Sequence, residues 1–287
     1  MITAFIPGTK FPSVSITGEK CELMCKYCMG KYLKGMIRIK TPYELWSIAK
    51  GLKRRNAVGM LISGGFDRKG KLPVEPFFST IKRIKRELDM IISIHPGLVD
   101  KDMAVKMRRS GIDVVDYELV LDPIVIKEVM NLSREPDDFI KSLEVLVREG
   151  PPHIAVHIPL GMRFGKVFKE NEAVEIASEI CDSMLTFLVF IPTKGTPMEN
   201  IPPPNAEEVI EVIKRTRKKI KEIVLGCMRP PELKDTLDPV LIEKKLIDRI
   251  AVPRRRIIEE FKLKVVKSCC SIPKELLKRV YNVWERE

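Results

Sequence analysis

The chain contains no glutamine and only three histidines, while charged residues make up 31% of its 287 residues. A surface rich in charge and poor in amides is typical of heat-adapted proteins, so we expect a thermophilic exterior with many ion pairs. The longest largely apolar run, Met184–Ile191, is too short to cross a membrane. Residues Met1–Phe11 lack the basic flank and apolar core of a secretory signal. We therefore expect a soluble, cytoplasmic protein.

The net charge of +12 allows two interpretations. One is a solvated, heat-adapted exterior, and the other is a surface that docks an acidic protein partner. Nucleic acid is not favoured, because no aromatic residues are interleaved with the basic runs to stack on bases. These runs are Lys53–Arg55, Arg217–Lys219 and Arg254–Arg256.

Short β-branched runs alternate with helical patterns, which is the rhythm of repeated βα units on a parallel sheet. Amphipathic stretches such as Pro42–Arg55, Pro76–Leu88, Asn171–Cys181 and Asn205–Lys221 lie between the runs. The pattern predicts an α/β fold, a (βα)8 barrel of the TIM type, with its site at the carboxyl ends of the strands. The eight expected strands are Ser13–Thr17, Val58–Ser63, Met90–Ile94, Val114–Val120, His153–Ile158, Leu185–Ile191, Glu222–Gly226 and Arg249–Val252.

Seven cysteines in a chain with no secretory signal favour metal ligation over disulfides, because a reducing compartment keeps thiols free. Cys21, Cys25 and Cys28 fall within eight residues, at x3 and x2 spacings. Such a loop fits a four-iron cluster, which prefers four thiolates and would here keep one open iron. A three-thiolate zinc site and an incidental group of thiols remain alternatives.

The x3/x2 spacing, with Tyr27 directly before Cys28, resembles the signature of the radical S-adenosylmethionine (SAM) enzymes. The resemblance implies that the three cysteines hold a [4Fe-4S] cluster whose open iron is chelated by SAM, and that Tyr27 contacts the adenine. Reduction of the cluster, by an electron donor such as ferredoxin, would split SAM and give a 5′-deoxyadenosyl radical.

Ser63, Gly64 and Gly65 close the second expected strand, where glycines let a ligand approach the backbone. In the family that this chain resembles, a Gly-Gly-Glu stretch here binds the SAM amino group. The third residue of this chain is Phe66, so only Ser63, Gly64 and Gly65 are carried over as SAM-binding residues. A plain loop-forming glycine pair is the alternative.

The alternation of the fourth expected strand puts Asp116 and Glu118 on one face. Buried carboxylates need partners. The resemblance to the biotin-synthase-like branch implies that these two bind the SAM ribose, and an ion pair with a Lys or Arg of the barrel is the alternative. No role is assigned to the histidines at strand ends, His95, His153 and His157.

Cys227 closes the seventh expected strand, and Cys269 and Cys270 precede the last helix. We expect residues 1–262 to form the barrel and residues 263–287 an extension that caps its mouth. If it does, these three thiols would ligate a second, auxiliary cluster, for which Ser271 or Arg229 could complete the ligand set. Small buried residues are the alternative interpretation.

The Gly226–Pro230 segment and the terminal Cys-Cys-Ser resemble subunits of the archaeal-type, two-protein lipoyl synthases. The resemblance implies a sulfurtransferase that uses an auxiliary [4Fe-4S] cluster to insert sulfur into a C–H bond of an octanoyl chain on an acidic carrier domain. A sister radical SAM subunit would treat the other carbon. Two alternatives stay open: another biotin-synthase-like reaction with one catalytic cluster, such as a methylation or rearrangement, and a metal-stapled binding protein.

Overall fold

A single curled parallel sheet forms the inside of the molecule. The computed structural model describes residues 2–181 and 183–284, and in this part of the chain the sheet has eleven strands in the order β11-β1-β10-β9-β8-β7-β6-β5-β4-β2-β3. The strands are β1 (Thr3–Phe5), β2 (Ser13–Ser15), β3 (Ile37–Arg38), β4 (Gly59–Ser63), β5 (Ile91–Ile94), β6 (Val114–Glu118), β7 (His153–Leu160), β8 (Met184–Val189), β9 (Glu222–Leu225), β10 (Arg249–Ala251) and β11 (Lys264–Val266).

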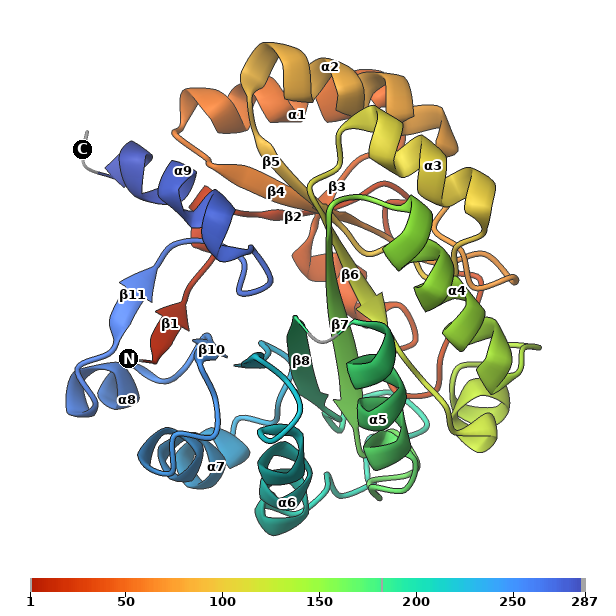
Figure 1. Cartoon of the computed structure of the whole chain (residues 1–287). Helices are drawn as coiled ribbons and strands as arrows, with labels where there is room; N and C mark the ends of the chain where they lie inside the picture. Colours follow the sequence, from red (N-terminus) through yellow and green to blue (C-terminus); the bar gives the residue numbers. More distant parts are fainter. Residues whose placement is uncertain (1, 182, 285–287) are drawn as a thin grey trace.

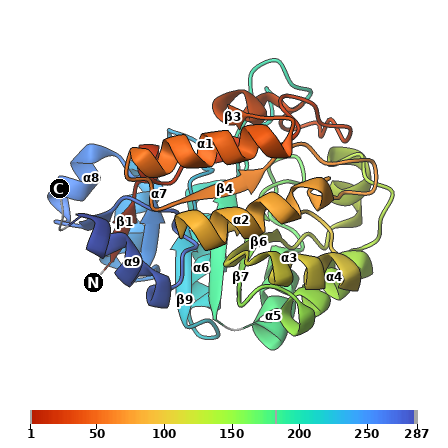
Figure 2. The same ribbon diagram turned by 90° about the horizontal axis from the view of Figure 1, so that it is seen from above.

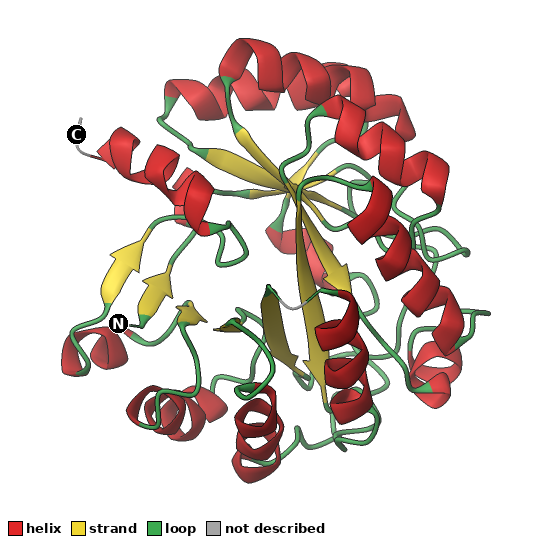
Figure 3. Cartoon of the chain, in the orientation of Figure 1, coloured by secondary structure: helices red, strands yellow, loops and turns green. Residues whose placement is uncertain are grey.

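The helices surround the convex side of this sheet, as Figure 3 shows. In Figures 1 and 2, α1 and α2 lie side by side outside β4. The helices are α1 (Pro42–Arg54), α2 (Phe78–Leu88), α3 (Lys101–Ser110), α4 (Pro136–Glu149), α5 (Glu170–Ile180), α6 (Ala206–Thr216), α7 (Leu233–Glu243), α8 (Arg255–Glu260) and α9 (Lys274–Trp284). None of the helices in the described ranges is both long and apolar enough to span a membrane.

Local signals set where these helices begin. Before α1, the Thr41 hydroxyl accepts from the Glu44 backbone N–H (3.2 Å) and the Glu44 carboxylate accepts from the Thr41 N–H (3.0 Å), which is a capping box. The Asp100 carboxylate caps α3 by accepting from the Met103 N–H (3.0 Å). Both helices begin at the carboxyl edge of the sheet, where the sequence predicted the site.

Strand alternation separates the two faces of the sheet, and β6 shows this most clearly. The Tyr117 side chain points outward, where its hydroxyl donates to the Phe139 carbonyl of α4 (2.8 Å). Its neighbours Asp116 and Glu118 therefore point to the concave side. The predicted placement of these carboxylates on one interior face is confirmed.

All eight predicted strands are present, and the predicted α/β fold with a curled parallel sheet of the TIM type is confirmed, but the sheet of the described residues does not close into a full barrel. A closed barrel would pair β10 with β2, whereas β10 pairs with β1 and β1 pairs with β11. The sheet of the described residues is thus open, with β3 at one edge and β11 at the other. The sequence pattern missed β1, β3 and β11, which have two or three residues, whereas it found β2 and β10, which are as short.

The end of the chain packs between the two edges of the open sheet, where Figure 1 shows α9 between β11 and β2. Leu277 and Val280 of α9 share an apolar cluster with Phe5, the last residue of β1, and with Val58, which directly precedes β4. Arg279 also donates to the backbone carbonyl of Asp89 (2.9 Å). The segment before α9 lies inside the curl of the sheet. The boundary at residue 263 stays a prediction, and residues 285–287 of the expected extension lie outside the described part.

Candidate functional site

Cys21, Cys25 and Cys28, called here the first trio, lie in the loop that follows β2. Cys25 is buried, and the other two are half-buried. The Cys28 and Met29 N–H groups both donate to the Cys25 carbonyl (3.1 and 2.9 Å), so the chain turns sharply between the second and third thiols. Met24 (φ 46°) and Met29 (φ 48°) adopt left-handed backbone conformations in this turn. The local fold thus draws the three cysteines to one side of the loop.

The pKa shifts show how close these thiols are. A hydrogen bond with Cys28, then burial and the charges of Cys28 and Cys21, raise the pKa of the Cys25 thiol. The same hydrogen bond to Cys25 lowers the pKa of Cys28. Cysteines bind metals as thiolates, so ligation by the first trio would release protons.

Two neighbouring loops hold the first trio in place. The Phe66 carbonyl accepts from the Glu22 N–H (2.9 Å), and the Val129 carbonyl accepts from the Lys26 N–H (2.7 Å). The Asn131 amide donates to the carbonyls of residues 23 and 24, at 3.0 Å each. The loop is thus fixed through its backbone, and the Cys21 and Cys25 thiols donate to the carbonyls of Phe66 (3.9 Å) and Met130 (3.4 Å).

Gly65, one of the predicted SAM-binding residues, has a packing role that the sequence did not reveal. Its N–H donates to the Thr17 hydroxyl (2.7 Å). A Cβ atom at Gly65 would lie 2.0 Å from the Lys20 carbonyl oxygen and 2.5 Å from the Cys21 Cα. Only glycine lets β4 end so close to the first cysteine. Ser63 and Gly64 stand beside it at the carboxyl end of β4, with Ser63 buried and in register with Ser15 of β2.

Glu118 of β6 lies next to the first trio. Burial raises the pKa of Tyr27, and the charges of Cys25 and Glu118 raise it further. Glu118 also raises the pKa of Cys25. On its other side, a Glu118 carboxylate oxygen stands 3.9 Å from Nε2 of His95. The charge of Glu118 thus reaches both Tyr27 and the first trio.

Asp116 faces a different neighbourhood, although it lies only two residues from Glu118. Its carboxylate accepts from the Ser93 hydroxyl (2.9 Å), and its other oxygen lies 3.4 Å from Nε2 of His157. Burial would raise the pKa of Asp116, but His157, Ser271 and Ser93 lower it overall. Asp116 is therefore tied to the C-terminal segment, and the expected Lys or Arg partner is replaced by histidine.

The histidine contacts were missed by the sequence reasoning, which assigned these residues no role. Glu118 and His157 are paired positions of adjacent strands, so their side chains share the concave face. A strand register would have revealed this neighbourhood, but a single sequence does not give one.

Cys227 lies just after β9, and Cys269 and Cys270 lie before α9; these three cysteines are called here the second trio. Cys227 is exposed as a residue, but burial of its thiol and then the charge of Cys269 raise its pKa. A hydrogen bond with Cys269, then burial and the charges of Cys269 and Cys227, raise the pKa of Cys270. Arg249 anchors the segment, since its Nη1 donates to the carbonyls of Cys270 (2.8 Å) and Ile272 (2.5 Å). Cys270 also packs in the apolar cluster that contains Ile272.

Of the two side chains considered to complete the second ligand set, Arg229 is wrong for that role. It is fully buried in a bidentate ion pair with Asp238 (2.8 and 2.7 Å), and its Nη1 donates to the carbonyls of Gly226 and Ala251. Ser271 stays a candidate, because its Oγ lies 3.1 Å from the Cys269 Sγ.

The two trios offer thiolates, which are ligands of both zinc and iron–sulfur clusters. Among residues 2–181 and 183–284, no three His, Cys, Asp or Glu side chains surround one point closely enough to share an ion. A mononuclear zinc site requires this, whereas a cluster binds each thiolate at a different iron. Polar atoms without partners also point to a missing group or ordered water on the concave side. In the described part these are Thr186 Oγ1, Arg249 Nη2 and Ser268 Oγ, whereas Asp116 Oδ1 and His157 Nε2, which also make no hydrogen bond, lie 3.4 Å from each other.

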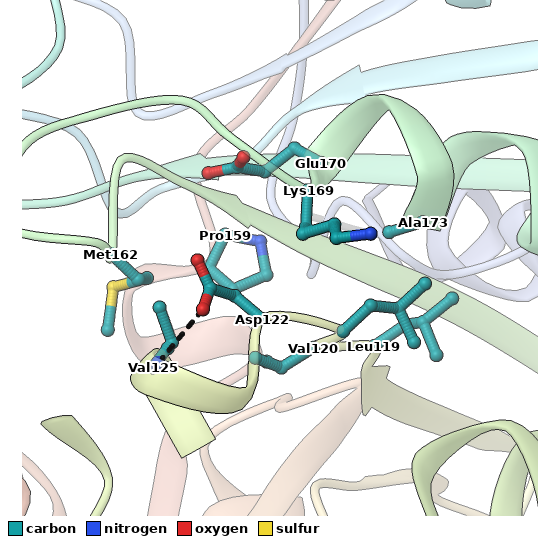
Figure 4. Close-up of a pocket in the computed structure, with 10 residues that line it drawn as sticks. Leu119, Val120, Asp122, Val125, Pro159, Met162, Lys169, Glu170 and Ala173 are labelled. Atoms are coloured by element: carbon teal, nitrogen blue, oxygen red, sulfur yellow. Dashed lines mark hydrogen bonds between the residues drawn. The ribbon is translucent and has the colours of Figure 1, made fainter. Parts of the chain in front are cut away.

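A small pocket outside the sheet, beside the ends of β6 and β7, does not join this site. Figure 4 shows the carboxylates of Asp122 and Glu170 among its lining residues. Its volume is about 20 Å³, which is room for a water molecule. Glu170 accepts from the N–H groups of Gly161 (2.9 Å) and Phe168 (2.6 Å), and burial raises its pKa. The pocket supports the loop after β7 and is too small for a substrate.

No family model matches the chain, but individual proteins do. The chain is 24% identical to biotin synthase from Aquifex aeolicus (strain VF5) over 226 residues. This matched region covers 73% of this chain and 64% of the biotin synthase. Methylornithine synthase (PylB) has a TM-score of 0.61 at 18% identity, over 99% of this chain and 82% of that one. The FeFe-hydrogenase maturase HydG from Carboxydothermus hydrogenoformans has a TM-score of 0.68 at 14% identity, over 100% of this chain and 75% of that one.

These similarities agree with the chemistry of the site. The curled α/β sheet is shared with both solved structures. The match to biotin synthase, together with this fold, supports the radical SAM superfamily and its biotin-synthase-like type. The chain spans less than two thirds of the biotin synthase. The matched proteins differ in the reactions that their names describe, so they do not single out one substrate.

Proposed function

We propose that this protein is a radical SAM enzyme that inserts sulfur into a C–H bond of a protein-bound octanoyl chain, as one subunit of a two-protein lipoyl synthase. The single observation that carries the proposal is the presence of two separate trios of thiols in one chain. One trio accounts for a SAM-binding cluster. A second trio supplies ligands for an auxiliary cluster that can donate sulfur. A sulfur-inserting enzyme needs such a cluster, whereas a methylase or a rearrangement enzyme does not.

In this proposal the first trio holds a [4Fe-4S] cluster, which with bound SAM supplies the radical chemistry. Glu118 and Tyr27, which neighbour the first trio, orient the ribose and adenine of SAM. The backbone of Gly64 and Gly65 contacts the amino group of SAM. The glutamate that follows the two glycines in the family's Gly-Gly-Glu stretch is replaced here by Phe66. Because Asp116 is engaged with Ser93 and neighbours His157 and Ser271, we assign the ribose to Glu118 rather than to Asp116.

The second trio holds the sulfur-donating cluster in this proposal, and the chain's own residues position it. Arg249 fixes the backbone of Cys270 and Ile272. Asp116 neighbours Ser271, whose hydroxyl lies 3.1 Å from the Cys269 Sγ. β6 thus supports both trios from adjacent inward positions, which keeps their separation constant. The net charge of +12 suits an acidic octanoyl carrier domain, and a sister radical SAM subunit would complete the reaction.

The test uses anaerobically reconstituted protein with SAM, dithionite and an octanoylated carrier domain. We expect formation of 5′-deoxyadenosine and a carrier whose mass increases by one sulfur atom. Cys227→Ala should abolish the mass increase and keep SAM cleavage, whereas Cys181→Ala, a cysteine outside both trios, should keep both. Cleavage of SAM with a product that gains no sulfur, and no dependence on Cys227, would contradict the proposal and favour methylation or rearrangement.

A further inference from the structure

An open pocket of about 290 Å³ lies on the outside of the molecule, between the N-terminal parts of α3 and α4. Four cationic side chains line it, namely Lys71, Lys101, Arg134 and Lys141, against two carboxylates, Asp100 and Asp138. In Figure 1 these helices lie next to each other on the side of the molecule away from the chain termini. The pocket is separate from the concave site, and nothing in the proposed chemistry uses it.

The carboxylates of this basic pocket are already engaged. Asp100 caps α3 and pairs with Lys71, and the Lys71 ammonium, by hydrogen bonding to Asp100, lowers the pKa of that carboxyl. Asp138 accepts from the Glu135 N–H (2.9 Å) in the capping box of α4.

The cations of the pocket are not all engaged. Lys101 lies 3.4 Å from a Glu149 carboxylate oxygen. Arg134 and Lys141 form no ion pair with another residue in the described ranges. The pocket therefore presents two uncommitted positive charges to whatever enters it, and a partner with exposed carboxylates would offset them.

The wall behind this pocket is the same pair of loops that holds the first trio. Lys71 follows the loop whose Phe66 carbonyl accepts from the Glu22 N–H. Arg134 follows Asn131, whose amide donates to the carbonyls of Leu23 and Met24. The two segments that contact the cysteine loop thus also carry two of the cations of the basic pocket.

We propose that the basic pocket is the docking surface for an acidic one-electron donor protein that reduces the group held by the first trio. The inference rests on the proposed function, because only a redox group at the first trio needs such a donor. The donor is oxidised by one electron and the group is reduced by one, with no bond made or broken. A carrier domain is less suited to this place, because its chain must reach the concave side of the sheet, while the pocket lies outside it.

The experiment compares Arg134→Glu/Lys141→Glu with a control of equal charge change, Arg215→Glu/Lys218→Glu, on exposed positions at the end of α6. The probe is an acidic ferredoxin, and the readouts are its equilibrium binding and its rate of cluster reduction. We expect roughly ten-fold weaker binding and slower reduction for the pocket variant at low salt. The effect should shrink as salt screens the charges. The milder Arg134→Gln/Lys141→Gln pair should give a smaller loss in the same direction.

Dithionite, which needs no docking surface, should reduce all variants at the same rate. Equal losses of ferredoxin binding and reduction rate in the pocket and control variants would overturn the inference, because net charge alone would then explain them. Unchanged ferredoxin binding in the pocket variant would overturn it too. A protein that binds iron normally but shows either result refutes only the docking site. A protein that binds no iron at the first trio refutes the proposed function itself.

Discussion

Replacement of Gly65 by alanine should remove the first cluster while leaving the fold intact. The added Cβ would lie 2.0 Å from the Lys20 carbonyl oxygen and 2.6 Å from the Cys21 Cβ. Carbon and oxygen do not approach within 3.0 Å in such contacts, so the backbone at residues 20 and 21 must move by at least about 1 Å. Ligand distances in a metal site hold to about 0.2 Å. Cys21 would thus leave its ligand position.

Gly65→Ala should impair cluster binding more than it lowers the free energy of unfolding. Overpacking of this kind typically costs about 1–3 kcal/mol, and here the loop can relax at the expense of the first trio. Iron and acid-labile sulfide should each fall by about four atoms per chain, the content of one cubane. Circular dichroism should show an unchanged secondary structure. SAM cleavage under reduction should be lost with the iron.

Gly35→Ala is the matched control, because a Cβ there meets no atom within 4 Å and the residue follows the same cysteine loop. It should retain full iron content and SAM cleavage. If Gly65→Ala also retained full iron and cleaved SAM at the wild-type rate, the close approach of β4 to Cys21 would not matter. The account of Gly65 as a packing residue for the first trio would then be refuted.

Two further predictions concern stability. Asp238→Asn leaves the Arg229 guanidinium buried without its anion and should lower the unfolding free energy, measured by denaturant titration, by about 3–5 kcal/mol. The control Asp235→Asn lies on the same helix, and because its ion pairs are exposed it should cost under about 1 kcal/mol. Equal losses in the two variants would contradict this prediction. Because burial raises the pKa of Glu170 above 4.5, its contribution to stability should fall as pH rises through that raised pKa. Glu170→Gln should remove this slope, whereas the exposed control Glu172→Gln should keep it; a slope that survives in Glu170→Gln would contradict the assignment.

The sequence was most informative where a signal is local. The first trio lies within one loop, so its spacing alone predicted that the thiols would gather. The eight predicted strands were recognisable by their β-branched runs, and the alternation of β6 correctly placed Asp116 and Glu118 on the concave face. Each of these features depends on residues that are close together in the chain.

The features that were missed depend on long-range packing. β1 and β11 are strands of three residues, and their insertion beside β10 is what leaves the sheet open. The split between Glu118, at the first trio, and Asp116, at the second, follows from where residues 269–272 enter the curl of the sheet. The availability of Arg229 as a ligand was misjudged because its partner Asp238 comes from a helix that packs over it. No spacing in the sequence reports such contacts.

The most direct test of the account is iron and sulfide content after anaerobic reconstitution in three proteins. They are the native chain, a Cys21/Cys25/Cys28→Ala variant and a Cys227/Cys269/Cys270→Ala variant. Two independent cubanes predict about eight irons in the native chain and about four in each variant, with SAM cleavage lost only when the first trio is removed. The contradicting result is about four irons in the native chain, none in the variant without the first trio, and an unchanged four in the variant without the second trio. The second trio would then hold no cluster.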